Sequence, residues 1–444
     1  MPYEDESDFL VPRGYLPRLV DSRLDFLLEA FGAVEITGAK WSGKTWTALA
    51  HSRSVTHLDD DSVLARAIEA PETALRGDEP HLIDEWQELP LVWDEVRRTV
   101  DVRANLPGQF ILTGSTRLKI ENGGEKGEQP KRREVHHSGA GRIKRLRMWP
   151  MTLAEEGLSN GSVSIAGLFA GTFEGGECST SLDDIAEWCC RGGWPANVGR
   201  PYEVAAETAA SHLESLYDVS IPRMKLHPAT ASDLVYALAL NLAQAATVET
   251  LALDMAHGDE NGMPARTTVE RYLDVLKRLF VIYEVSGWSA PMRSKARARV
   301  KPKRYFVDPS LAAIALHATP ARLMDDMQTL GSLFETMVMR DLSAFVSVYP
   351  GIDNEVRYYR DQAGLEVDAI LEVDGRWAAI EVKLSEAKVD AAADSLLQLA
   401  RKATSNPMAR IGEPAFLAVV VGSGNVAYQR KDGVYVLPVA TLTA

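Results

Sequence analysis

The feature that most constrains the fold of this chain is an eight-residue segment near its start. Residues 38–45 read GAKWSGKT, which fits the pattern G-x-x-x-x-G-K-[ST], and the apolar run AVEIT (33–37) comes directly before them. The glycines of such a segment let the backbone fold around a phosphate group, so that its N–H groups and the start of the following helix point at the anion. The sequence therefore predicts a P-loop in a parallel α/β domain that binds ATP.

Each residue of the P-loop is a candidate nucleotide contact. The eight residues are Gly38, Ala39, Lys40, Trp41, Ser42, Gly43, Lys44 and Thr45. We expect Lys44 to reach the β- and γ-phosphates and Thr45 to bind Mg²⁺. The alternative is an ordinary glycine-rich turn, which the apolar run before the segment and the helical pattern after it disfavour.

Two further apolar runs end in polar residues. The run HLIDEW contains Asp84 and Glu85, and the later run FILTGS contains Thr113 and Ser115. We expect Asp84 to hold the Mg²⁺ through water, and Glu85 to act as the catalytic residue that orients and deprotonates the attacking water. Thr113 or Ser115 is a candidate sensor of the γ-phosphate. The alternative for the two acids is a plain strand-to-helix turn with an acidic N-cap.

An arginine follows a long polar stretch. Residues 119–141 are rich in glycine and charge and read as an exposed loop. Arg142 comes directly after them and is a candidate for an arginine that reaches the ATP of a neighbouring subunit. A solvated surface arginine is an equal alternative. The sequence leaves open whether the chain forms a homo-oligomer.

Length and composition limit the remaining possibilities. A chain of 444 residues predicts two to four domains, and 46% hydrophobic with 25% charged residues is the balance of a soluble globular protein. Its three cysteines are too few for a disulfide framework or a zinc site of usual spacing. The acidic start and the lack of about 18 uninterrupted apolar residues predict a cytoplasmic protein without a membrane partner.

The middle of the chain has the pattern of a winged helix-turn-helix. Three helical candidates are followed by two β-rich runs, which is the order of elements in that fold. The candidates are residues 230–244, 247–256, 266–279, 280–285 and 304–308.

Cations occupy alternate positions between the two β-rich runs. They are Arg293, Lys295, Arg297, Arg299, Lys301 and Lys303, and Arg304 adds a seventh. An extended segment with this spacing lays six cations along one face, which would grip the phosphate backbone of DNA without reading its sequence. A flexible, solvated basic loop is the alternative. The net charge of −14 argues against coating of nucleic acid by the whole protein, but not against a local basic site.

The last hundred residues carry a second candidate site. The runs LEVDAI and AIEVKL contain Asp368, Glu381 and Lys383. Residues i and i+2 of a strand share a face, so Glu381 and Lys383 would project together, and Asp368 on a partner strand could share a divalent metal with Glu381. We expect Lys383 to act beside the attacking water, and Glu335 to be a further metal ligand from a helix. This D…E-x-K arrangement is that of restriction-endonuclease-like nucleases; an ordinary amphipathic hairpin is the alternative.

Taken together, these segments resemble one prokaryotic family of AAA-type ATPases whose C-terminal half is domain of unknown function 4143. The segments are YLPR, the P-loop, HLIDE, FILTGS, GRI, RGGWPA, YFVDPSLA and EVD…IEVK, in that order. The resemblance implies a P-loop ATPase domain, a winged helix and a nuclease-like tail. Two departures are the length of the 119–141 loop and the presence of Trp41 and Ser42 where the family has small residues.

The sequence thus predicts four parts and one overall activity. The parts are a P-loop AAA-type ATPase domain (1–160), a helical lid or linker (161–227), a winged helix-turn-helix domain (228–318) and a restriction-endonuclease-like α/β domain (319–444). We expect an ATP-hydrolysing switch or motor that acts on or with nucleic acid, with ATP and Mg²⁺ as cofactors and a tail that is a metal-dependent nuclease or its inactive descendant. The alternative is an ATP-gated regulatory module that engages a protein partner.

Overall fold

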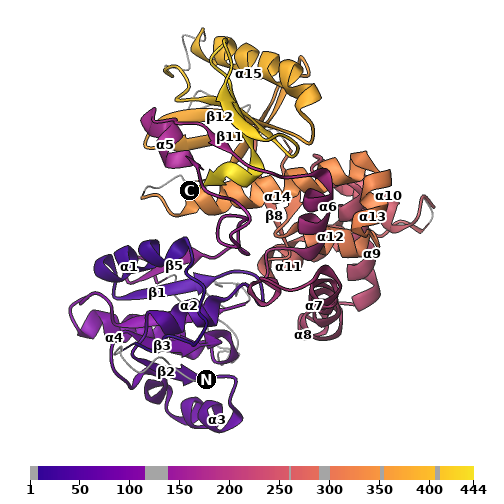
Figure 1. Cartoon of the computed structure of the whole chain (residues 1–444). Helices are drawn as coiled ribbons and strands as arrows, with labels where there is room; N and C mark the ends of the chain where they lie inside the picture. The colour runs from indigo at the N-terminus through magenta and orange to yellow at the C-terminus, as the bar shows by residue number, and fades with distance from the viewer. Residues whose placement is uncertain (1–8, 116–138, 260–261, 290–300, 351–354, 406–410) are drawn as a thin grey trace. The chain divides into compact units, whose positions relative to one another are not determined.

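The computed structural model describes residues 9–115, 139–259, 262–289, 301–350, 355–405 and 411–444. It divides into two compact units (Figure 1). The N-terminal unit comprises Met1–Trp149 with Arg278–Phe280, and the C-terminal unit comprises Pro150–Lys277 with Val281–Ala444. Within the described ranges, no helix is both long and apolar enough to cross a membrane.

The N-terminal unit is built on a parallel sheet of five strands in the order β2-β3-β4-β1-β5. The strands are β1 (Ala33–Thr37), β2 (Ser54–His57), β3 (His81–Asp84), β4 (Phe110–Gly114) and β5 (Ile143–Arg147). Every residue of β1, β3 and β4 is buried, as expected for central strands of a parallel sheet covered on both faces. The predicted mixed α/β fold is therefore confirmed for this unit.

Helices connect these strands. They are α1 (Val20–Ala30), α2 (Lys44–Ala50), α3 (Asp61–Glu69) and α4 (Leu91–Val102), with 3₁₀ turns at Pro71–Leu75 and Trp86–Glu88. The apolar face of α4 packs into a core with Trp86, whose ring lies 4.9 Å from that of Trp93. Because β4 lies between β3 and β1, the carboxyl ends of these three strands meet at one edge of the sheet.

The first half of the C-terminal unit is mainly helical. They are α5 (Ile165–Ala170), α6 (Leu182–Arg191), α7 (Tyr202–Ser215), α8 (Ile221–Arg223), α9 (Pro228–Leu240), α10 (Val248–Met255) and α11 (Arg266–Arg278), with 3₁₀ and π turns at Pro195–Asn197 and Leu216–Ser220. An antiparallel pair follows, formed by β8 (Ile282–Val285) and β9 (Lys303–Phe306), and then α12 (Pro309–Ala315) and α13 (Pro320–Asp325). The three helices and the strand pair lie where the sequence predicted them; their assignment as a winged helix stays a prediction.

A seven-stranded sheet forms the tail, in the order β10-β11-β12-β13-β15-β14-β7. Its strands are β7 (Gly176–Glu177), β10 (Arg357–Arg360), β11 (Glu366–Val373), β12 (Arg376–Lys383), β13 (Leu417–Val421), β14 (Val426–Gln429) and β15 (Tyr435–Pro438). Strands β10, β11 and β12 are antiparallel, and β12, β13 and β15 are parallel. The long helix α14 (Met327–Ser347) precedes β10, and α15 (Val389–Thr404) connects β12 to β13.

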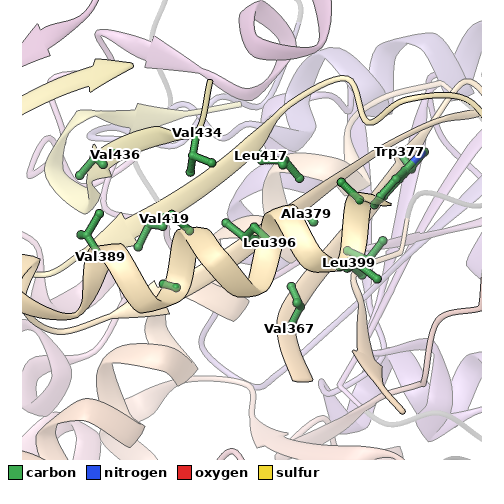
Figure 2. Close-up of a cluster of buried hydrophobic side chains, with 14 of the residues drawn as sticks. Val367, Trp377, Ala379, Val389, Leu396, Leu399, Leu417, Val419, Val434 and Val436 are labelled. Atoms are coloured by element: carbon green, nitrogen blue, oxygen red, sulfur yellow. The ribbon is translucent and has the colours of Figure 1, made fainter. Parts of the chain in front are cut away.

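Helix α15 packs its apolar face on the sheet (Figure 2). Leu396 and Leu399 of the helix lie in one buried cluster with Trp377 of β12, Val419 of β13 and Val436 of β15. Two short strands from the predicted lid or linker also join the tail. β7 pairs with β14, and β6 (Val163–Ser164) pairs with β16 (Leu442–Thr443). The predicted domain boundaries stay predictions, but the tail fold uses residues from before its predicted start.

A buried ionic network explains two segments that the sequence singled out. Arg340 of α14 is 1% exposed and donates to Asp308 over 2.7 Å. The same carboxylate accepts from the backbone N–H of Gly193 over 2.9 Å, and the indole of Trp194 donates to Ser310. A Cβ on Gly193 would lie 2.1 Å from a backbone carbonyl oxygen, which excludes a larger residue. RGGWPA and YFVDPSLA are therefore structural segments that close the core of the C-terminal unit.

Candidate functional site

The P-loop connects β1 to α2 and needs its glycines. A Cβ on Gly38 would lie 2.2 Å from the backbone oxygen of Met148, so no larger residue fits there. Gly43 has φ +97°, in the left-handed region that glycine adopts without strain. Trp41 has φ +59° in the same region and is 49% exposed. A non-glycine residue held in this conformation is uncommon, and here it lies within the loop that would surround a phosphate.

Lys44 is folded back into the loop. Its side chain is 6% exposed, and Nζ donates to the carbonyl of Ala39 over 2.6 Å. Burial lowers the pKa of Lys44 to about 8, although the charges of Glu85 and Asp84 act to raise it. The ammonium thus has a neutral partner in the loop and lies near two carboxylates. An anion bound in the loop would replace that weak partner with a strong one.

Asp84 is the acceptor at the centre of the site. Its Oδ1 accepts from Thr45 of α2 over 3.1 Å and from the hydroxyl of Thr113 of β4, and His57 of β2 lies 3.3 Å from Oδ2. Burial acts to raise the pKa of Asp84, but the bonds from His57, Thr113 and Thr45 hold it below the usual range. The carboxylate is therefore ionised at neutral pH and ready for a cation.

Glu85 lies beside Asp84 in a strained backbone position. It has φ +52°, and burial raises its pKa above the usual range. The amide of Gln87 donates to Oε2, and the hydroxyl of Ser115 lies 3.5 Å from the same oxygen. Gln87 and Ser115 thus fix the carboxylate that the sequence predicted as the base.

Arg18 binds the P-loop from the segment YLPR. It is 7% exposed and donates to the carbonyls of Ser42 over 2.7 Å and Trp149 over 2.9 Å. Its backbone N–H donates to Asp21, which also accepts from the hydroxyl of Tyr15 over 2.6 Å. The side chain of Arg18 thereby joins the P-loop to Trp149 of the same unit.

Sequence reasoning missed the roles of three residues: Arg18, His57 and Gln87. His57 is paired with Asp84 in the register of β2 and β3, which no linear pattern reveals. Gln87 lies two residues beyond Glu85, and Arg18 belongs to a segment that had been used only for the resemblance.

Arg142 does not lie at the P-loop of its own chain. Its carbonyl accepts from the N–H of Ala33, the first residue of β1, whereas the P-loop follows the last residue, Thr37. The side chain pairs with Asp101 over 2.6 Å. The length of β1 therefore separates Arg142 from the nucleotide site in the same chain. A role in a neighbouring subunit stays a prediction.

The tail brings Asp368, Glu381 and Lys383 together on β11 and β12. Nζ of Lys383 donates to Glu381 over 2.5 Å and to Asp368 over 3.2 Å. Asp368 also accepts from the N–H of Val382 over 3.0 Å. Burial and the charge of Asp368 raise the pKa of Glu381 to about 9. The predicted spacing thus produces a compact ion cluster.

Lys303 completes this cluster and departs from its predicted role. The sequence placed it on a solvent-facing basic run, but its side chain is 3% exposed. Nζ lies 2.7 Å from Glu366, 3.5 Å from Glu335 and 3.6 Å from Asp368. Although burial acts to lower the pKa of Lys303, the surrounding carboxylates raise it. A buried ammonium with these partners is not available to a phosphate.

The rest of the predicted basic run is only partly described. Lys301 is exposed, and its carbonyl accepts from the hydroxyl of Tyr358. Arg293, Lys295, Arg297 and Arg299 lie outside the described residues.

Glu335 projects from α14 toward the cluster. It accepts from the hydroxyl of Tyr305 over 2.7 Å, and burial together with the charge of Asp368 raises its pKa to about 7. Over the part of the chain that the structure describes, no group of three or more His, Cys, Asp or Glu could hold a metal ion. The predicted ligands Glu335, Asp368 and Glu381 are therefore neighbours without the arrangement of a metal site.

Three segments match known families. Residues 31–156 match an AAA domain, residues 182–322 match a domain of unknown function (DUF8612), and residues 330–442 match another (DUF4143). The first match covers the P-loop and the Asp84 site, and the last covers the tail ion cluster apart from Lys303.

Two curated proteins and two solved structures are similar to this chain. Uncharacterized proteins of Mycobacterium bovis and Mycobacterium tuberculosis are each 25% identical over 401 residues, which is 87% of this chain and 79% of theirs. The Walker-type ATPase PABY2304 of Pyrococcus abyssi has a TM-score of 0.42 at 14% identity, over 70% of this chain and 99% of its own. The ORC2 protein of Aeropyrum pernix, in its ADPNP–ADP complexes, has a TM-score of 0.29 at 10% identity, over 76% and 99%.

The P-loop segment and the tail-strand segment thus match the two domain families that the sequence resemblance implied. The chain carries an N-terminal AAA domain and a C-terminal DUF4143 domain.

Proposed function

We propose that this chain is an ATP-hydrolysing switch whose active site is the carboxyl edge of the N-terminal sheet. One observation carries the proposal: the P-loop, Thr45, Asp84 and Glu85 converge there, with Lys44 beside them. The residues present fit ATP and Mg²⁺, because the loop offers backbone N–H groups and a buried ammonium, and Thr45 and Asp84 offer oxygen ligands in contact with each other. Bound Mg²⁺–ATP supplies the phosphoanhydride and neutralises part of its charge.

The chain's own residues divide the work at this site. The P-loop and Lys44 hold the phosphates, and His57 and Thr113 fix the orientation of Asp84. Glu85 orients the attacking water and takes its proton, and burial raises the pKa of its carboxyl, which makes it a stronger base than an exposed glutamate. Gln87 and Ser115 position that carboxylate.

We propose further that the switch acts with nucleic acid. The alternating cations between β8 and β9 support this, because Lys301 is exposed and four more cations of the run precede it in the sequence. The second candidate is an ATP-gated module for a protein partner with a tail that does not cleave. Lys303 and Lys383 already pair with the tail carboxylates, which favours a tail that does not cleave. Experiment must decide whether the partner is a nucleic acid or a protein.

The nucleotide site is tested with Lys44→Ala and a matched control. Lys144→Ala is the control, because Lys144 is exposed on β5 at the edge of the same sheet. We expect Lys44→Ala to lose ATP binding, measured by isothermal titration, and ATP turnover, measured by phosphate release; the control should keep both. Turnover that survives Lys44→Ala would refute the assignment.

The nucleic-acid part is tested by measuring ATP turnover with and without duplex and single-stranded DNA. Stimulation by either form supports the proposal. Equal turnover in all conditions, together with no DNA binding at low salt, would favour the protein-partner alternative.

A further inference from the structure

The tail carboxylates do not fit the divalent metal that the nuclease resemblance implies. One oxygen of each carboxylate already accepts a hydrogen bond: Oδ2 of Asp368 accepts from Val382 N–H and from Lys383, and Oε2 of Glu381 accepts from Lys383. Oε1 of Glu335 accepts from Tyr305. A divalent cation needs several such oxygens turned toward one point at about 2.0–2.6 Å. These three oxygens instead face the ammonium groups of Lys383 and Lys303 and the hydroxyl of Tyr305.

Lys303 stands where a cation shared by the carboxylates would stand. Its Nζ is within 3.6 Å of Glu366, Glu335 and Asp368, which come from β11 and α14. It also lies 5.4 Å from the centre of the Tyr358 ring on β10, in the range of a cation–π contact. One ammonium with three donors thus serves three carboxylates and one aromatic face.

Two ammonium groups occupy the space beside Asp368. Nζ of Lys303 lies 3.6 Å from one oxygen of that carboxylate, and Nζ of Lys383 lies 3.2 Å from the other. A divalent ion that entered would meet both positive charges at close range, which opposes its binding.

The cluster has a second consequence because Lys303 begins β9. The two chain segments that flank the basic run are both bound to the tail sheet. On one side, Trp288 N–H donates to the Tyr358 carbonyl over 2.6 Å, and the Trp288 ring stacks on Trp377 at 5.1 Å. On the other side, the Tyr358 hydroxyl donates to the carbonyl of Lys301, and Lys303 enters the carboxylate cluster.

We propose that Lys303 is the resident cation of the tail site, so that this site takes no divalent metal and cleaves no phosphodiester. Its role is to fasten the β8–β9 pair to β10 and β11 and so to fix the base of the basic run. This inference does not depend on ATP hydrolysis, and it replaces the predicted metal-dependent nuclease with a closed ion cluster.

The test is a titration of the full-length chain with Mn²⁺, followed by electron paramagnetic resonance. The parent carries Asp84→Asn and is free of nucleotide, so that the nucleotide site does not contribute. We expect no tight Mn²⁺ site in this parent, one per chain after Lys303→Ala is added, and none again after Asp368→Asn is also added. Adding Lys388→Ala instead, which removes an exposed lysine of the same unit, should create no site.

Two results would overturn the proposal. One is tight Mn²⁺ binding by the parent that disappears with Asp368→Asn or Glu381→Gln. The other is a folded Lys303→Ala chain, shown by circular dichroism, that gains no Mn²⁺ site. If Lys303→Ala does not fold, the Mn²⁺ titration of the parent still tests the proposal, because the parent keeps Lys303. A tight site lost with Asp368→Asn would refute the proposal, and the absence of a tight site would support it.

Discussion

The two carboxylate sites of this chain use the same residue types in opposite ways. In the N-terminal unit, Asp84 is bound by two hydroxyls and a histidine, and the nearby Lys44 donates to a backbone carbonyl. In the tail, every carboxylate of the cluster has a lysine within 3.6 Å. The comparison teaches how a lysine can indicate what a carboxylate site binds. A lysine that does not pair with the nearby carboxylates leaves them able to bind a charged ligand. A lysine that pairs with them occupies the position that a metal ion would take.

The largest expected effect is at Glu85. Glu85→Gln keeps the shape and hydrogen-bonding size of the side chain but removes the base, so ATP turnover should fall by about 10²- to 10⁴-fold while ATP binding persists. Single-turnover phosphate release and a separate binding titration measure the two. Glu88→Gln, an exposed neighbour on the same turn, serves as control. Equal turnover in both variants would remove Glu85 from the mechanism.

The next effect compares the two lysines directly. Lys303→Ala leaves the buried Asp368 and the partly buried Glu335 and Glu366 without this cation and should lower the free energy of unfolding by about 3–5 kcal/mol. Lys44→Ala should change it by about 1 kcal/mol or less, because the lost hydrogen bond is offset by relief from burying an ammonium. Urea unfolding followed by circular dichroism gives both numbers. Similar losses for the two variants would erase the proposed difference between the sites.

A smaller effect is expected at Arg18, which holds the P-loop through a hydrogen bond to the carbonyl of Ser42. Arg18→Ala removes two buried hydrogen bonds, so the carbonyl oxygens of Ser42 and Trp149 lose this donor. The free energy of unfolding should fall by about 1–3 kcal/mol. If the loss destabilises the nucleotide-bound conformation of the loop by about 1.4 kcal/mol, ATP affinity drops by about tenfold. Arg13→Ala, an exposed change in the same segment, should do neither. An Arg18→Ala chain with normal stability and normal ATP affinity would contradict this role.

The smallest effect separates two lysines that lie two positions apart. Lys301 is exposed and Lys303 is buried, so Lys301→Ala should weaken DNA binding slightly and reduce the slope of log affinity against log salt by about one. Lys388→Ala should leave the slope unchanged. Fluorescence anisotropy of labelled DNA at several salt concentrations measures both the affinity and the slope. Binding that does not depend on salt would argue against phosphate contacts by this run.

The nucleotide site could be predicted from sequence because its information is local. The glycine spacing specifies a loop between a strand and a helix, and the acids of HLIDEW come at the end of the next buried apolar run. In the sheet that run is β3, with β4 between it and β1. His57 could not be found, because its contact with Asp84 depends on which strand lies beside β3. Arg142 was predicted to reach the ATP of a neighbouring subunit. The parallel direction of β5 puts it at the far end of β1 from the P-loop of its own chain, and the role in a neighbouring subunit stays a prediction.

The tail shows a different limit. Alternation along residues 293–303 predicts that Lys301 and Lys303 share a face of an extended chain. In the structure Lys301 is exposed, whereas Lys303, the first residue of β9, is buried. Alternation cannot say whether a neighbouring element covers that face. Lys303 and Tyr305, two residues apart on β9, both contact Glu335 of α14, so here the face is turned inward. A charge pattern predicts a face, and only tertiary packing decides what that face meets.

The central claim is that one site of this chain is open to a metal–nucleotide complex and the other is closed. It is tested most directly by counting Mn²⁺ bound to the unaltered chain in the presence of a non-hydrolysable ATP analogue. The account predicts one Mn²⁺ per chain, lost with Asp84→Asn and kept with Asp368→Asn. Two Mn²⁺ per chain, or one that is lost only with Asp368→Asn, would contradict it.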